Sequence, residues 1–163
     1  MRLPALAAAA LLASASTALA APAAVSVTIG PELQEKAEKT YGVRDVQRLA
    51  DSLRGEVERS LAKSGAHQDA RIELVLTDAK PNRPTFKQLG DTPGLSMESF
   101  GVGGAAIEGR LVAADGKVTP LKYRWYESDI RQAYGDWVWS DAELSFDRFA
   151  SRLARNDTRL AQR

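Results

Sequence analysis

The chain has 163 residues, no cysteine, one histidine and a formal net charge of +1 at pH 7. The lack of cysteine excludes disulfides, thiol nucleophiles and cysteine-based metal sites. The balance of basic and acidic side chains lacks the basic excess typical of nucleic-acid-binding proteins, so we expect no nucleic-acid partner.

The first 20 residues have the pattern of a secretory signal peptide. Arg2 provides a basic start, residues 3–12 are rich in Ala and Leu, and a small-x-small cleavage motif ends at Ala20. We therefore expect cleavage between Ala20 and Ala21 and a periplasmic or secreted protein. The apolar stretch is shorter than the roughly 20 residues that span a bilayer, and a lipoprotein would need a cysteine, so we expect no stable membrane anchor.

The first predicted elements after this segment are a strand and a short helix. Residues 25–29 alternate apolar and polar side chains and are rich in β-branched residues, which is typical of a strand. Pro31 follows Gly30 and predicts the first position of a short helix, which Gly42 should end.

The clearest predicted helix lies between Asp45, a candidate N-cap, and Gly65, a candidate stop. Its apolar residues recur at the helical period, which predicts one buried face. They are Val46, Leu49, Ala50, Leu53, Val57 and Leu61. Gly55 interrupts this pattern, and a close contact with a neighbouring element would explain it.

A second strand is predicted at 71–78, followed by an irregular stretch at 79–104 that contains several prolines and glycines. Within it, residues 84–90 favour one helical turn with Phe86 and Leu89 as anchors. A connection of this length is typical of a lid, a binding loop or a cover for a sheet face.

Residues 105–114 and 118–127 predict a hairpin, because Asp115-Gly116 separates two alternating segments. Tyr123 and Trp125 should face the core. Pro120 places the second strand at an edge or a bulge, since proline cannot donate to a ladder.

The last predicted helix begins with a capping box of Ser140 and Glu143 and a hydrophobic staple of Trp139 and Leu144. Its buried stripe is Ala142, Phe146, Phe149 and Leu153. The order β-α-β-β-β-α predicts an α+β fold, with a mixed or antiparallel sheet packed by the long helix and the C-terminal helix. We expect one domain over 21–155 and a polar, frayed tail over 156–163.

The candidate chemistry has simpler structural explanations in each case. Residues 101–106 fit G-x-G-x-x-A, but a strand follows where a dinucleotide site needs a helix, so close backbone packing at the strand entry is favoured. His67 lies in a polar turn without ligand spacing. Four acidic residues (Asp129, Asp136, Asp141 and Asp147) follow no recognised pattern, which favours surface and capping roles. We therefore expect no cofactor, no metal ion and no identified catalytic residue.

Aromatic residues gather between positions 123 and 139, including all three tryptophans. Part of this group should be core. Four residues are less well explained by packing and are the predicted ligand- or partner-binding residues: Tyr126, Arg131, Tyr134 and Trp137. Aromatic faces beside arginine suit a sugar ring, a peptide or another protein.

Residues 103–109 (GGAAIEG), the hairpin, residues 139–143 (WSDAE) and residues 146–150 (FDRFA) resemble small exported bacterial proteins of unknown function. The resemblance covers roughly 70–155. It implies an envelope α/β domain with its C-terminal helix packed on a sheet, and no catalytic residue. Several such proteins are lipoproteins, and this chain differs from them because it has no cysteine to carry a lipid.

Two functions are compatible with the sequence. The first is a non-catalytic binding module that contacts an envelope protein or envelope component through the 79–104 loop and the Tyr126–Trp137 region. The alternative is a carboxylate-dependent hydrolase that uses Asp129 and Asp136. The sequence does not specify an oligomeric state.

Overall fold

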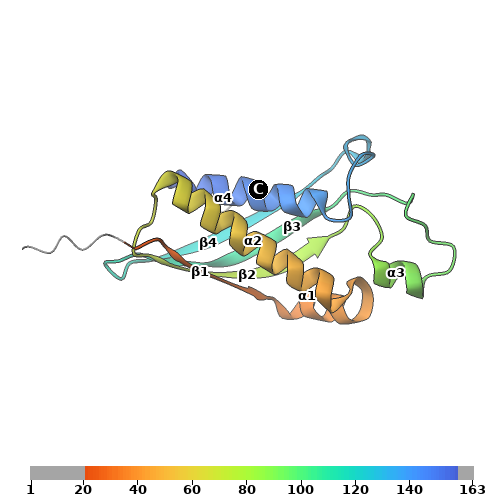
Figure 1. Cartoon of the computed structure of the whole chain (residues 1–163), viewed down its shortest axis with the longest axis horizontal. Helices are drawn as coiled ribbons and strands as arrows, with labels where there is room; N and C mark the ends of the chain where they lie inside the picture. Colours follow the sequence, from red (N-terminus) through yellow and green to blue (C-terminus); the bar gives the residue numbers. More distant parts are fainter. Residues whose placement is uncertain (1–20, 158–163) are drawn as a thin grey trace, which may run out of the picture.

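The computed structural model describes residues 21–157 (Figure 1). The predicted signal segment 1–20 and most of the predicted tail 156–163 lie outside the described residues. The described part forms two layers, a four-stranded mixed sheet and two long helices that lie side by side on one face of it. The predicted α+β class and the order β-α-β-β-β-α are confirmed, and the sheet is mixed.

The strands lie in the sheet in chain order. They are β1 (Ala24–Ile29), β2 (Arg71–Lys80), β3 (Gly104–Val112) and β4 (Val118–Tyr126). β1 is parallel to β2 because helices return the chain between them, whereas β2–β3 and β3–β4 are antiparallel. The Asp115-Gly116 turn closes the predicted hairpin, with Gly116 at φ 83°. β4 forms an edge of the sheet, which is where Pro120 is tolerated.

The first helical region begins and ends at glycines. Gly30 precedes α1 (Pro31–Lys36), a π-helical segment continues over Ala37–Tyr41, and Gly42 with φ 99° separates it from α2 (Val43–Ser64). Gly65 ends α2 in the left-handed conformation, as predicted.

Two predictions for α2 are wrong. The N-cap position is Gly42, because α2 begins before Asp45, which instead pairs with Arg48 at 2.9 Å within the first turn. A Cβ at Gly55 would meet only the Arg59 guanidinium at 3.3 Å, so no neighbouring element explains that glycine.

The core lies between the sheet and the two helices. The six predicted apolar residues of α2 are all buried, and so are the predicted stripe residues of α4 (Ser140–Ala154). Tyr123 packs against Phe149 with ring centroids 5.9 Å apart. The opposite face of the sheet carries mostly polar side chains.

The predicted capping box at α4 is also wrong. Ser140 Oγ accepts from Trp137 N at 2.8 Å, so it closes the preceding turn rather than capping the helix. Leu144 is 39% exposed, and Trp139 packs edge-on against Tyr41 with centroids 5.6 Å apart, so the two do not form a staple.

A capping box instead starts α3 (Phe86–Asp91), where Thr85 Oγ1 accepts from Gln88 N and Gln88 Oε1 accepts from Thr85 N. The predicted helical turn is therefore present, but Phe86 is 80% exposed and does not anchor it to the core.

Candidate functional site

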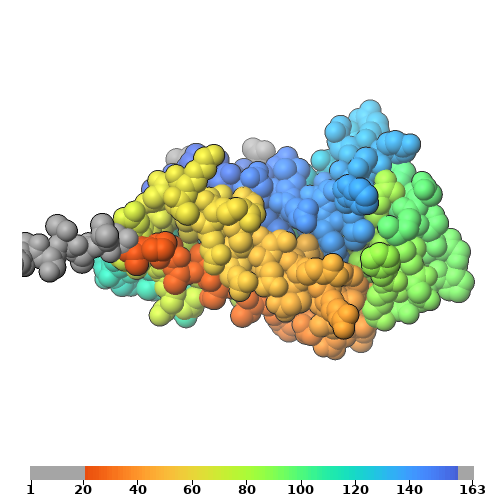
Figure 2. Space-filling model, in the orientation of Figure 1, coloured from red at the N-terminus to blue at the C-terminus, as the bar shows by residue number. Residues whose placement is uncertain are grey.

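Two loops that are distant in sequence lie side by side at one end of the molecule. Residues 81–103 join β2 to β3 and contain α3, and residues 127–139 join β4 to α4 (Figure 1). Asn82 N donates to Val138 O at 2.7 Å, and Glu127 N donates to Gly103 O at 3.0 Å. In the space-filling view the two loops form one continuous surface (Figure 2).

Asn82 links both loops to the start of α4, and only 2% of it is exposed. Its Nδ2 donates to Asp141 Oδ2 at 2.6 Å and also lies within hydrogen-bond distance of Asp136 Oδ2 and Gly101 O. Its Oδ1 accepts from Asp141 N at 3.0 Å. The Asp141 carboxylate also accepts from Gly103 N at 2.8 Å, so this buried carboxylate is well satisfied.

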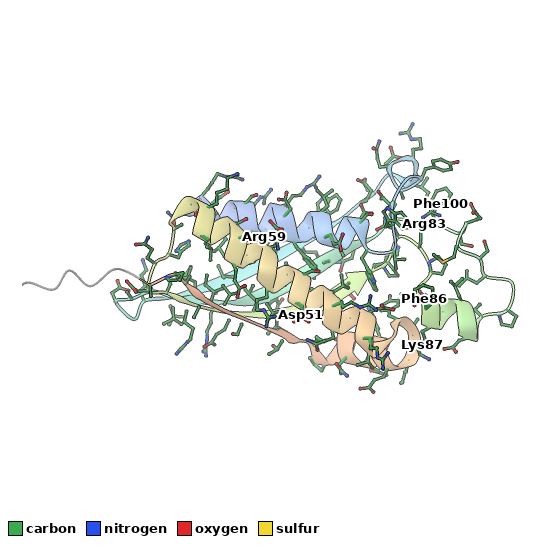
Figure 3. All side chains as sticks on the ribbon, in the orientation of Figure 1. Asp51, Arg59, Arg83, Phe86, Lys87 and Phe100 are labelled. Atoms are coloured by element: carbon green, nitrogen blue, oxygen red, sulfur yellow. The ribbon has the colours of Figure 1, made fainter. Side chains whose placement is uncertain are left out.

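Arg83 holds the outer part of the same two loops. Its guanidinium donates to the carbonyl oxygens of Asp136, Met97 and Tyr134, the last two at 2.8 Å. Its Cζ lies 5.9 Å from the centroid of the Phe100 ring (Figure 3). Because the guanidinium presents several donors in a rigid plane, one side chain fixes three separate points of the backbone.

Of the two glycines that define the G-x-G-x-x-A pattern, Gly103 serves close packing, whereas a Cβ at Gly101 would meet nothing within 4 Å. A Cβ at Gly103 would lie 2.6 Å from both Asn82 Oδ1 and Lys80 O, and β3 begins at the next residue. The expectation of close packing at a strand entry is confirmed.

Large apolar side chains project into solvent from the two loops that Asn82 and Arg83 hold together. We call this group the aromatic end: Phe86, Met97, Phe100, Tyr134 and Trp137. Phe86, Tyr134 and Trp137 are 80%, 74% and 78% exposed, and Phe100 meets Tyr134 edge-on with centroids 5.7 Å apart. Exposed apolar side chains that gather on one surface are typical of interaction sites.

A cavity of about 250 Å³ lies within this region. Most of its lining is apolar or aromatic and comes from α3 and the two loops. Its charged lining residues, Asp45 and Arg48 of α2, pair with each other at 2.9 Å. The cavity is therefore suited to an apolar side chain, since it offers few free polar groups.

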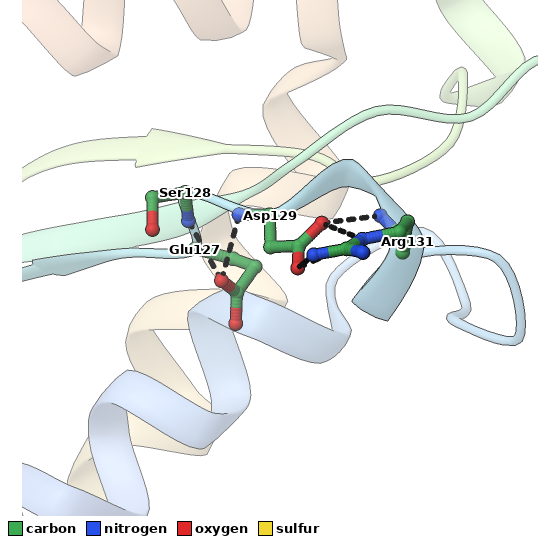
Figure 4. Close-up of polar contacts among 4 residues, drawn as sticks. All are labelled: Glu127, Ser128, Asp129 and Arg131. Atoms are coloured by element: carbon green, nitrogen blue, oxygen red, sulfur yellow. Dashed lines mark hydrogen bonds and ion pairs between the residues drawn. The ribbon is translucent and has the colours of Figure 1, made fainter.

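The structure brings together two of the four predicted binding residues, Tyr134 and Trp137, at the aromatic end. Arg131 lies nearby in the sequence, in a 3₁₀ turn (Ile130–Gln132). Its guanidinium is engaged by Asp129, with Nη2–Oδ2 at 2.7 Å and Nε–Oδ1 at 2.9 Å (Figure 4). This hydrogen-bonded pair holds the pKa of Asp129 below its ordinary value.

Tyr126 belongs to a separate polar cluster on the open face of the sheet. Its hydroxyl donates to Asp78 Oδ2 at 2.5 Å, and Lys36 Nζ donates to Asp78 Oδ1 at 2.7 Å. Arg124 stacks on the Tyr126 ring, with Cζ 5.2 Å from its centroid. These residues line a shallow cavity of about 540 Å³ that contains charges of both signs.

The pKa values of this cluster follow from its hydrogen bonds. Burial acts to raise the pKa of Asp78, but the hydrogen bonds from Lys36 and Tyr126 outweigh it and lower the value. Burial, together with the bond to Asp78, raises the pKa of Tyr126. The ionised Asp78 and the neutral tyrosine are therefore the favoured forms.

Of the remaining candidates, Asp136 and His67 are engaged in structural contacts, and Asp147 lies exposed on α4. Burial and the nearby Asp141 raise the pKa of Asp136, whose carboxylate accepts from Asn82 at 3.1 Å. His67 adopts φ 55° in the turn after α2, and its Nε2 lies 3.0 Å from Leu153 O. Among residues 21–157, no group of three His, Asp or Glu side chains is placed to hold a metal ion.

A comparison with protein-family models found no match, and neither did a comparison with curated proteins. No helix within the described range is long and apolar enough to cross a membrane.

Sequence reasoning missed Asn82, Arg83, Met97 and Phe100 as parts of the site. The only local signal was the length and proline content of the 79–104 connection. The side-chain contacts that matter join positions 50–60 residues apart, which no local pattern reports.

Proposed function

We propose that this protein is an exported, non-catalytic binding module of the cell envelope and that the aromatic end is its binding surface. One observation carries this proposal: exposed aromatic and Met side chains from three chain segments project together from a base fixed by Asn82 and Arg83. A rigid base limits the entropy lost on binding. Trp and Tyr supply large contact areas.

The occupant is an apolar segment of another envelope protein. The cavity beside Phe86 and Trp137 has a mostly apolar lining, and its Asp45–Arg48 pair is internally satisfied. A sugar ligand would need several free hydrogen-bonding groups around the aromatic rings, which makes it a poorer fit.

The export part of the proposal has support at the predicted cleavage point. Ala21 N donates to Asp69 Oδ1 at 2.7 Å, and Asp69 N donates to Ala21 O at 2.9 Å. Cleavage between Ala20 and Ala21 would turn this amide into an ammonium beside a carboxylate, which is a stronger hydrogen bond. Cell fractionation and N-terminal sequencing test this step, and a cytoplasmic protein that retains residues 1–20 would contradict it.

Photo-crosslinking in intact cells tests the binding surface. A benzophenone amino acid placed at Tyr134 should give a discrete adduct that maps to an apolar segment of one envelope protein. The same probe at Lys122, on the polar sheet face, is the matched control and should give none. The adduct should be lost when Phe86→Ala and Trp137→Ala are combined. An adduct that survives this double substitution, or the absence of any adduct, would contradict the proposal.

One observation favours the alternative, a carboxylate-dependent hydrolase, for one of its two predicted residues: Asp136 shares a donor with Asp141, whereas Asp129 is paired with Arg131. Asp136 and Asp141 both accept from Asn82 Nδ2, and the pKa of Asp136 is raised. A carboxyl group whose pKa is raised can act as a general acid. This alternative predicts turnover of a glycoside, ester or peptide substrate that Asp136→Asn abolishes. No turnover of such a panel by the wild-type protein would count against it.

A further inference from the structure

β1 has an open hydrogen-bonding edge. It is the terminal strand, and Ala24 N and Gly30 N donate to Ala70 O and Leu76 O of the β2 side, both at 2.9 Å. In a parallel pair alternate residues bond to the neighbour, so the backbone groups of Val25, Val27 and Ile29 point to the free side. Within residues 21–157 no hydrogen bond occupies those groups.

This edge lacks the features that usually prevent strand pairing. The sequence of β1, AVSVTI, contains no charge, no proline and no bulge. The opposite edge, β4, carries Pro120, Lys122 and Arg124. Sheet edges are normally protected by such residues, and an uncharged edge of β-branched residues is open to another strand.

The inner side of the same edge is also incompletely covered. Val25, Val27 and Ile29 are only half-buried beneath α2. A groove of about 670 Å³ runs between the start of β1 and the C-terminal half of α2, lined by residues that include Ala23, Leu61 and Ala62. A further strand beside β1 would place in this groove the inward side chain that lies next to Val25.

We propose that the occupant of this edge is β1 of a second copy of the chain, paired antiparallel about a two-fold axis through Val27. Val25 then lies opposite Ile29 of the second copy, and Ser26 lies opposite Thr28. The pairs at 25, 27 and 29 are those whose backbone groups face outward, so each pair can exchange both hydrogen bonds. Because β1 is uncharged, no like charges meet across the axis.

The helices permit this arrangement. Neighbouring strands lie about 4.8 Å apart, and packed helices lie about 10 Å apart. Two packed helices are therefore about as wide as four strands. If two sheets join at β1, the α2 helices of the two copies lie at an ordinary helix-packing distance from each other. We expect a dimer that dissociates on dilution, because the paired strand β1 has only 6 residues. This inference does not depend on the aromatic end.

Sedimentation velocity over a concentration series tests the dimer, using the purified protein after expression of the full chain. The wild-type protein should shift from monomer to dimer as concentration rises. Ser26→Lys combined with Thr28→Lys places lysines opposite one another on the solvent-exposed face and should give monomer throughout. Its thermal midpoint should equal that of the wild type at a concentration where the wild type is monomeric. Val118→Lys, on the protected β4 edge, is the matched control and should behave as wild type.

Hydrogen exchange provides an independent readout. The amides of Val25, Val27 and Ile29 should become protected with increasing concentration in the wild type but not in the double-lysine variant. A wild-type protein that stays monomeric would overturn the inference. So would a dimer that survives the double substitution, or one that is instead lost on Trp137→Ala.

Discussion

At the scale of single residues, the clearest physical effects come from buried or partly buried polar side chains that are satisfied by hydrogen bonds. Asp78 stays ionised on a sheet face because Lys36 and Tyr126 both donate to it. Asp141 stays buried because Asn82 and Gly103 N surround it with donors. Neither arrangement is visible in the local sequence, since the partners lie 38–59 positions away.

The Asp78 cluster predicts a pH-dependent contribution to stability. The folded pKa of Asp78 lies below its ordinary 3.8, because the donated hydrogen bonds outweigh burial. A lowered carboxyl pKa contributes stability that is fully present above the unfolded value and is lost as pH falls through the folded value. Asp78→Asn should therefore be less stable than wild type at neutral pH, and the difference should shrink below about pH 4.

Urea unfolding at a series of pH values measures this effect. Tyr126→Phe keeps the ring and removes one donor, so its stability should lie between those of the wild type and Asp78→Asn. A stability difference between wild type and Asp78→Asn that stays constant from neutral to acidic pH would contradict the predicted titration of Asp78.

Between elements, Asn82 decides how the two loops join α4. Asn82→Ala removes one donor from the buried Asp141 carboxylate, which keeps Gly103 N, and leaves the buried Asp141 backbone N–H without its acceptor. We expect a loss of about 2–3 kcal/mol in the free energy of unfolding. Gln34→Ala is the control, because Gln34 makes an exposed bond to Glu38 and its loss should cost under about 0.5 kcal/mol. Equal losses in the two variants would show that the Asn82 network is not a significant source of stability.

Helix α4 offers a comparison of its buried and exposed faces. Phe149 is fully buried against Tyr123, so Phe149→Ala should cost about 3–5 kcal/mol in urea unfolding. Leu144 lies on the same helix but is 39% exposed, so Leu144→Ala should cost about 0.5 kcal/mol. A large loss at Leu144 would mean that the predicted staple forms in solution.

At the scale of the whole molecule, the apolar surface is distributed unevenly. Trp137 is 78% exposed, whereas Trp125 and Trp139 are half-buried in contact with the core. Trp137→Phe should therefore lower the acrylamide quenching constant of tryptophan fluorescence. Trp139→Phe should raise or preserve it. An unchanged quenching constant for Trp137→Phe would show that this part of the aromatic end is covered in solution.

The sequence determined the strands, the long helices, the hairpin and the two buried stripes, because each depends on a period or a turn signal within about ten to twenty neighbouring residues. It also marked Tyr134 and Trp137 as poorly explained by packing, which agrees with their exposure. The position of Tyr126 beside Asp78, the role of Ser140 in the turn before α4 and the exposure of Phe86 were decided only by the tertiary structure. The physical reason is that a side chain's hydrogen-bond partner or covering surface comes from whichever element packs beside it, and in this protein those elements meet only after the sheet and its two helices have assembled.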